Sequence, residues 1–107
     1  MAYKVLAQSA PSAATATDVY TVGSGVETVI STIIIANRAA SAGTFRLSVR
    51  PNGGTQTNAM YCAYDVPVAG SDSTTLTLGL TVDAADVITV YCSSADMSVN
   101  IFGTEIS

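Results

Sequence analysis

Hydrophobic and polar residues alternate along most of this 107-residue chain, in short blocks separated by turn residues. The clearest block is 73–82, in which threonine and glycine alternate with four aliphatic residues, Leu76, Leu78, Leu80 and Val82. The block 43–50 shows the same alternation. A period of two places successive side chains on opposite faces of a strand, whereas a helix repeats about every 3.6 residues. These blocks therefore predict strands that bury one face in a core.

Eight strands follow from this pattern, and no segment has a helical period. Clusters of turn residues, such as 23–25 and 51–54, separate the strands. The strands are predicted at 3–8, 18–22, 26–38, 43–50, 60–68, 73–82, 87–92 and 97–105. So many short strands predict an all-β fold, a single antiparallel β-sandwich or jelly-roll-like domain spanning residues 1–107.

Two prolines affect the predicted structure of the segments that contain them. Pro11 interrupts the segment 9–17, which is rich in Ala, Ser and Thr, so we expect an extended loop or arm there. One turn of helix is the alternative for this stretch. Pro67 has no amide hydrogen to donate to a sheet ladder, which places the strand 60–68 at a sheet edge or near its end.

The strand 26–38 departs from simple alternation, because Ile33, Ile34 and Ile35 are apolar on both of its faces. A strand covered on both sides has this pattern, but a two-layer sandwich buries only one face of each sheet. We expect the second face to lie under a subunit contact, with the arm 9–17 as a third layer as the alternative. These three isoleucines are therefore candidate interface residues.

Composition points to association rather than to nucleic acid. Charged residues make up 11% of the chain and hydrophobic residues 49%, against about 25% charged in ordinary domains. So few charges provide little repulsion between copies. The net charge of −4 and the dispersed basic residues argue against phosphate contacts. The chain has no signal-peptide core and no apolar run of about 20 residues, so we expect a soluble, cytosolically made protein without a membrane partner.

Catalytic arrangements are not predicted, because the chain has no histidine and a single lysine, Lys4. Four aspartates fall at predicted turns and are interpreted as caps that accept hydrogen bonds from nearby backbone amides; they are Asp72, Asp83, Asp86 and Asp96. A loop calcium site at Asp83 and Asp86 is the alternative, although the spaced oxygen ligands of a calcium motif are missing. We expect no enzyme activity, no metal and no cofactor.

Arg46 and Arg50 lie on the polar face of the strand 43–50. They are either solvated or paired with carboxylates of a neighbouring copy, and on the second interpretation they join the candidate interface residues. Cys62 and Cys92 lie in strand-like segments and are interpreted as reduced core thiols. A disulfide formed after release from the cytosol is the alternative.

The strand tyrosines are assigned to the core or its rim. They are Tyr61, Tyr64 and Tyr91. A carbohydrate-binding platform would use exposed aromatic residues, ideally tryptophan, and the chain has none. Sugar binding is therefore a secondary hypothesis.

Much of the chain resembles a family of small virion proteins of tailed bacteriophages, through strand phrases at 3–8, 18–22, 29–38, 45–49, 64–68 and 99–106. The resemblance implies a non-enzymatic structural protein of the virion, made in the cytoplasm of the bacterial host. The leading expectation is a trimeric capsid decoration (cement) protein that contacts the major capsid protein or other virion proteins. A collar, neck or tail-fibre accessory protein is the alternative, the last as a receptor- or glycan-binding module whose loop 50–58 carries recognition.

Overall fold

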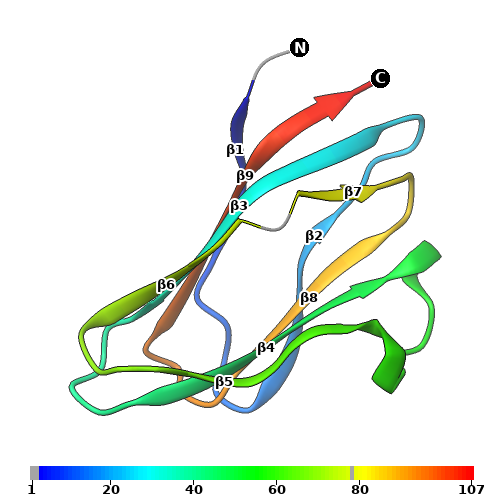
Figure 1. The fold of residues 1–107 in the computed structure, drawn as a ribbon. Helices are drawn as coiled ribbons and strands as arrows, with labels where there is room; N and C mark the ends of the chain where they lie inside the picture. Colours follow the sequence, from blue (N-terminus) through cyan, green and yellow to red (C-terminus); the bar gives the residue numbers. More distant parts are fainter. Residues whose placement is uncertain (1–2, 78) are drawn as a thin grey trace.

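Nine strands in two antiparallel sheets form the computed structural model of the protein, which describes residues 3–77 and 79–107 (Figure 1). In chain order the elements are β1 (Lys4–Ser9), β2 (Thr15–Thr21), β3 (Glu27–Asn37), β4 (Gly43–Arg50), the 3₁₀ turns η1 (Pro51–Gly53) and η2 (Asn58–Met60), β5 (Tyr61–Val68), β6 (Asp72–Leu76), β7 (Leu80–Val82), β8 (Val87–Cys92) and β9 (Met97–Ile106). The predicted all-β sandwich is confirmed, with nine described strands in place of eight.

Most connections cross from one sheet to the other. The five-stranded sheet has the order β1-β9-β3-β6, with β7 also paired to β3, and the four-stranded sheet has the order β2-β8-β4-β5. The pairs β1·β9, β2·β8, β3·β6 and β4·β5 are therefore nested, as if one long hairpin were folded over on itself. This nested order is that of a jelly roll.

Inward-facing residues of both sheets form one hydrophobic core. The alternation of 43–50 contributes Phe45 and Leu47 to this core, and both 43–50 and 87–92 form strands with the predicted bounds, β4 and β8. Burying one such aliphatic or aromatic side chain contributes about 1.5–3 kcal/mol. The largest fully buried hydrophobic side chains are Ile30, Ile33, Ile35, Phe45, Leu47, Val68, Ile88, Val90, Met97, Val99 and Ile101.

A β-bulge in β3 changes which residues face the core. The pairing of β3 with β9 shifts between Ile30 and Thr32, and one extra residue moves the alternation by one position. Ile30 before the bulge, and Ile33 and Ile35 after it, are all buried. A strict period of two would place Ile30 and Ile33 on opposite faces, so the period of two expected of a strand does not hold along the whole of 26–38.

The predicted strand 73–82 is divided in two. β6 ends at Leu76 and β7 begins at Leu80, with Gly79 between them at a φ of 62°. Glycine adopts this left-handed conformation without steric cost, and β6 and β7 pair with successive parts of β3. Leu78, part of the predicted alternation, lies outside the described residues.

The segment 9–17 is a shorter loop than expected, because β2 already begins at Thr15. The loop joins β1, at one edge of the five-stranded sheet, to β2, at one edge of the four-stranded sheet. It therefore closes one side of the sandwich rather than adding a third layer over β3 (Figure 1). At the opposite edge of the four-stranded sheet lies β5, which contains Pro67 as predicted.

Candidate functional site

The outer face of the four-stranded sheet carries most of the chain's organised polar chemistry. Alternation along β4 turns Arg46, Ser48 and Arg50 outward, since the residues between them are directed to the core. Cross-strand pairing then places Tyr91 of β8 beside Arg46, and Thr89 beside Ser48. Neighbours in register share a face, so this row of side chains follows from the pairing of β4 with β8.

Arg46 is held between two aromatic rings. Its guanidinium carbon lies 4.2 Å from the ring centroid of Tyr64 and 4.4 Å from that of Tyr91. Its Nε donates a hydrogen bond of 2.7 Å to Oδ1 of Asp65. The bond to Asp65 raises the pKa of Arg46, while partial burial opposes that shift. Ring stacking and the ion pair together fix the guanidinium plane.

Arg50 anchors the loop between β4 and β5 to the sheet. Its Nη1 donates to the carbonyl oxygen of Gly54 at 2.8 Å, and its Nη2 pairs with Oδ1 of Asp18 on β2 at 2.9 Å. Its Nε donates to the Thr89 hydroxyl at 3.1 Å. One arginine therefore ties the loop, β2 and β8 together.

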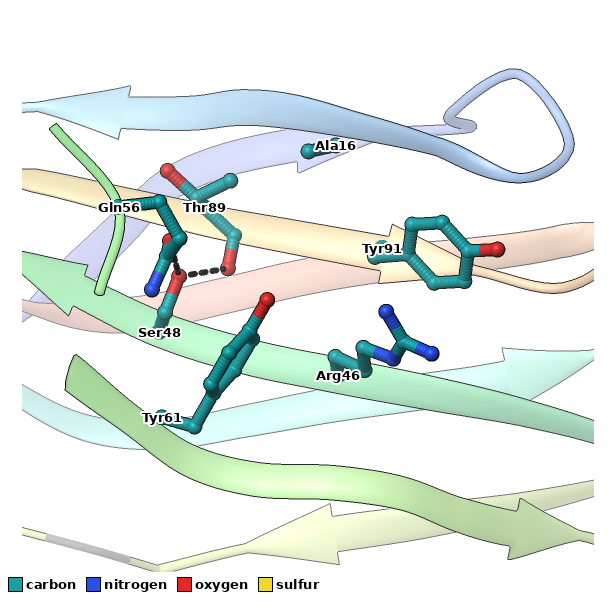
Figure 2. Close-up of a pocket in the computed structure, with 7 residues that line it drawn as sticks. All are labelled: Ala16, Arg46, Ser48, Gln56, Tyr61, Thr89 and Tyr91. Carbon is teal, nitrogen blue, oxygen red and sulfur yellow. Dashed lines mark hydrogen bonds between the residues drawn. The ribbon is translucent and has the colours of Figure 1, made fainter. Parts of the chain in front are cut away.

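A pocket of about 250 Å³ lies between this loop and the arginine-tyrosine stack (Figure 2). Ser48 donates a 2.7 Å hydrogen bond to Oε1 of Gln56, which comes from the loop. Tyr61 points its hydroxyl toward the strand that carries Thr89 (Figure 2). The lining residues are Ala16, Arg46, Ser48, Gln56, Tyr61, Thr89 and Tyr91.

The pocket combines aromatic rings, hydroxyls and an amide around paired charges. Arg46 is neutralised by Asp65, and Arg50 beneath the loop by Asp18. Such a lining suits the binding of a small polar molecule that has apolar edges. The described residues contain no cluster of three or more potential metal-ligating His, Cys, Asp or Glu side chains.

Three of the four predicted turn aspartates, Asp72, Asp83 and Asp86, accept hydrogen bonds from backbone amides. Asp86 accepts hydrogen bonds from the amides of Asn52 and Asp83, each at 2.8 Å. Asp83 accepts one from the amide of Ala84, and Asp72 accepts one from the next residue along the chain. The carboxylates of Asp83 and Asp86 are therefore engaged with backbone groups at their turn.

The outer face of the five-stranded sheet carries a second feature, which we call the apolar face. Val29 and Ile34 of β3 and Phe102 of β9 alternate with buried residues and point outward, each only partly exposed. Val5 lies opposite Phe102 and is 49% exposed. Tyr3 and Ile106 are also exposed near the ends of β1 and β9. The apolar face comprises Tyr3, Val5, Val29, Ile34, Phe102 and Ile106.

The structure separates the candidate interface residues. Ile33 and Ile35 lie in the core, whereas Ile34 between them faces outward on the five-stranded sheet. Arg46 and Arg50 lie on the other sheet, paired with carboxylates of their own chain rather than left in solvent. The five residues therefore do not form one surface, because alternation along β3 separates the isoleucines and the two arginines belong to the other sheet.

The two cysteines occupy different environments, and within the described residues both are free thiols. Cys92 is buried in β8, and burial raises its pKa to about 11. Cys62 is exposed on the edge strand β5, and partial burial raises its pKa as well. The core-thiol interpretation fits Cys92 and does not fit Cys62, which is exposed and lines an open pocket with Val49 and Leu80 beside the core.

Sequence reasoning missed the pocket residues Gln56, Tyr61 and Tyr91 as a group. They come from a loop and two strands that are far apart in the chain, and only the register of β4 with β5 and β8 brings them together. The available signal was the alternation of β4, which turns Arg46 and Ser48 to one face.

Comparison with protein-family models, with curated proteins and with solved structures finds no match to this chain. No helix within residues 3–77 and 79–107 has the length and hydrophobicity needed to span a bilayer. The role of the protein is therefore argued from its own sequence and geometry.

Proposed function

We propose that this protein is a non-enzymatic structural component of a tailed-bacteriophage virion, a trimeric decoration protein of the head. The observation that carries the proposal is the apolar face, a set of outward-facing hydrophobic residues on a sheet that no further layer of the described chain covers. The resemblance of the strand phrases to virion proteins supplies the context.

The physical argument concerns what an apolar sheet face does in water. Exposed apolar side chains favour association, because their burial removes apolar surface from water, and on this face they alternate with polar cross-strand partners such as Asn100 and Thr104. One charged residue, Glu27, lies opposite Ile106 at one end of the face, so a partner that covers this end must also accommodate a carboxylate. Trimer contacts or contacts with the major capsid protein supply the missing layer.

Such a protein stabilises the head by bridging neighbouring capsid subunits. Each contact is modest, but many copies on one particle act together and raise the effective affinity. The jelly-roll fold is also common in capsid proteins. After synthesis in the host cytoplasm, the protein is located in the virion.

A collar, neck or tail-fibre accessory role uses the same subunit at another position on the particle. A receptor- or glycan-binding role is favoured by a different observation, the pocket on the four-stranded sheet, and is developed in the next subsection.

Mass spectrometry of purified virions, followed by cryo-EM localisation, tests the proposal. We expect the chain in the particle, with density over capsomer joints and a trimeric mass by light scattering in solution. Density at the neck or tail would instead support the role of a collar, neck or tail-fibre accessory protein. Absence from the virion, together with a monomeric mass, would overturn the virion role.

A further inference from the structure

We propose that the pocket between Arg46, Gln56, Tyr61 and Tyr91 binds a single neutral pyranose unit of a surface glycan. The proposal rests on the outer face of the four-stranded sheet and stands independently of the virion role. It assigns a ligand class to a surface that the core of the sandwich does not require.

The size of the pocket limits the ligand to one small unit. Its volume of about 250 Å³ lies just below the range of about 300–1,000 Å³ that is usual for drug-sized ligands. One wall comes from Gln56 and Tyr61, and the facing wall from Arg46 and Tyr91 (Figure 2). A volume of this order is sufficient for one six-membered sugar ring.

The lining matches the two kinds of surface that a pyranose presents. Its C–H groups pack against aromatic rings, here those of Tyr61 and Tyr91. Its hydroxyls both donate and accept hydrogen bonds, as do amide and hydroxyl side chains. Within the described residues the hydroxyl of Tyr61 has no hydrogen-bond partner, so it is available to a ligand.

The charge balance selects a neutral ligand. Arg46 is already bonded to Asp65 at 2.7 Å, and the neighbouring Arg50 to Asp18 at 2.9 Å. A phosphate or a sugar acid would have to compete with these carboxylates, which repel it. A purely apolar ligand would leave the hydroxyl of Tyr61, which has no protein partner within the described residues, without a hydrogen bond.

The site is held in place before any ligand arrives. Two tyrosine rings and Asp65 fix the Arg46 guanidinium, and Ser48 fixes Gln56 through a 2.7 Å hydrogen bond. Arg50 holds the loop that carries Gln56 against the sheet. A pre-organised site loses less conformational entropy on binding, so weak individual contacts suffice.

Nuclear magnetic resonance titration of the ¹⁵N-labelled protein with methyl glycosides tests the proposal directly. The panel contains neutral hexoses, N-acetylhexosamines and, as charged comparisons, a uronic acid and a sialic acid, all at millimolar concentration. We expect at least one neutral glycoside to shift the amide resonances of Gln56, Tyr61 and Tyr91. Shifts confined to residues outside the pocket, or none with any glycoside, would overturn the proposal, as would binding of the acids alone.

Three variants make the result specific. Tyr61→Ala should weaken glycoside binding by about tenfold or more, the effect of losing one well-packed aromatic contact. Tyr61→Phe keeps the ring and tests the hydroxyl alone, with a smaller loss and no risk to the fold. Tyr3→Ala, the same change at an exposed tyrosine of the other sheet, should leave binding unchanged. Equal binding by all three variants contradicts the assignment.

Discussion

At the scale of single residues, Tyr20 is the most informative side chain that the hydrophobic pattern did not single out. It projects from β2 into the space between the sheets, where its hydroxyl donates a 2.6 Å hydrogen bond to Oε2 of Glu105. The same hydroxyl lies 2.9 Å from the hydroxyl of Thr28. Glu105 also pairs with Lys4 at 2.6 Å. One polar network therefore ties the four-stranded sheet to β1, β3 and β9.

Removing the Tyr20 hydroxyl should destabilise the folded protein, because the buried hydroxyl of Thr28 then loses its hydrogen-bond partner. An unpartnered buried polar group costs about 1–3 kcal/mol, so we expect Tyr20→Phe to lower the free energy of unfolding by about that amount. The double variant Tyr20→Phe with Thr28→Val removes the stranded hydroxyl at nearly constant shape and should regain much of the loss. Urea unfolding midpoints measure both effects.

Tyr64→Phe serves as the control for this cycle, since Tyr64 is exposed on the edge strand and should change stability by less than about 0.5 kcal/mol. A double variant less stable than Tyr20→Phe alone would contradict the assigned role of Thr28.

The same network predicts how stability depends on pH. Hydrogen bonds from Lys4, and then from Tyr20, lower the pKa of Glu105. A lowered folded-state pKa stabilises the protein above the unfolded value of about 4.3, and this contribution disappears as the pH falls through the folded-state pKa. Burial, and then the bond to Glu105, raise the pKa of Tyr20. Its contribution is present below about pH 10 and disappears as the pH rises through the raised pKa.

Unfolding free energies should therefore form a plateau between about pH 5 and 9. Urea titrations across this range measure the plateau, and Glu105→Gln should flatten the decline on its acid side. An unchanged acid decline in Glu105→Gln would assign that decline to other carboxylates.

The two thiols should differ sharply in reactivity. Iodoacetamide attacks the thiolate, and Cys92 is both inaccessible and held at a pKa of about 11. We expect labelling of Cys62 alone in the folded protein, and of both cysteines after denaturation, as measured by peptide mass spectrometry. Cys62→Ser should abolish native-state labelling. Equal labelling rates at the two positions would disprove the assigned burial.

At the scale of elements, β3 contains two adjacent residues with different expected roles, one in folding and one in assembly. Ile33 lies in the core and Ile34 on the apolar face. Ile33→Asp buries an unpaired carboxylate, which should cost more than about 4 kcal/mol and unfold the protein. Ile34→Asp should change stability by about 1 kcal/mol or less but abolish the oligomer.

Circular dichroism and light scattering distinguish these outcomes for the pair. If the Ile34→Asp variant is folded and fully oligomeric, the apolar face is not the assembly contact.

The elements also show where sequence reasoning succeeds. β4 and β8 match their predicted bounds because turn residues flank both strands, and β4 also has a clean alternation. The break between β6 and β7 was missed because Gly79 occupies a polar position of an unbroken alternation. The bulge in β3 was missed because it depends on the register with β9, in which Ser31 has no partner, and the sequence of β3 alone does not contain that register. The pocket was not predicted because it depends on the register of three strands, and no local sequence pattern determines that register.

At the scale of the whole molecule, the two proposed surfaces lie on opposite outer faces of the sandwich. The apolar face belongs to the five-stranded sheet, and the pocket belongs to the four-stranded sheet. A subunit docked through the apolar face therefore turns its pocket away from the contact. The all-β class was predictable from alternation and turns, whereas the jelly-roll order was one of several compatible topologies.

The nested order of strand pairs also dictates how the chain can reach this fold. β4 and β5 are close in sequence, whereas β1 and β9 lie at opposite ends of the chain. Each inner pair, once formed, shortens the loop that the next pair has to close, which lowers its entropic cost. Folding should therefore advance outward from β4·β5 and end with β1·β9, and such non-local pairing makes it slow.

Stopped-flow kinetics of two core truncations test this order. Val68→Ala in β5 should slow folding, with a φ-value of about 0.5–0.8, whereas Leu6→Ala in β1 should mainly speed unfolding, with a φ-value of about 0–0.3. The reverse pattern would place the nucleus at the termini. On the proposed route the two ends of the chain stay apart until the last step, so the outermost pair is the one that opens first when the folded protein is stressed.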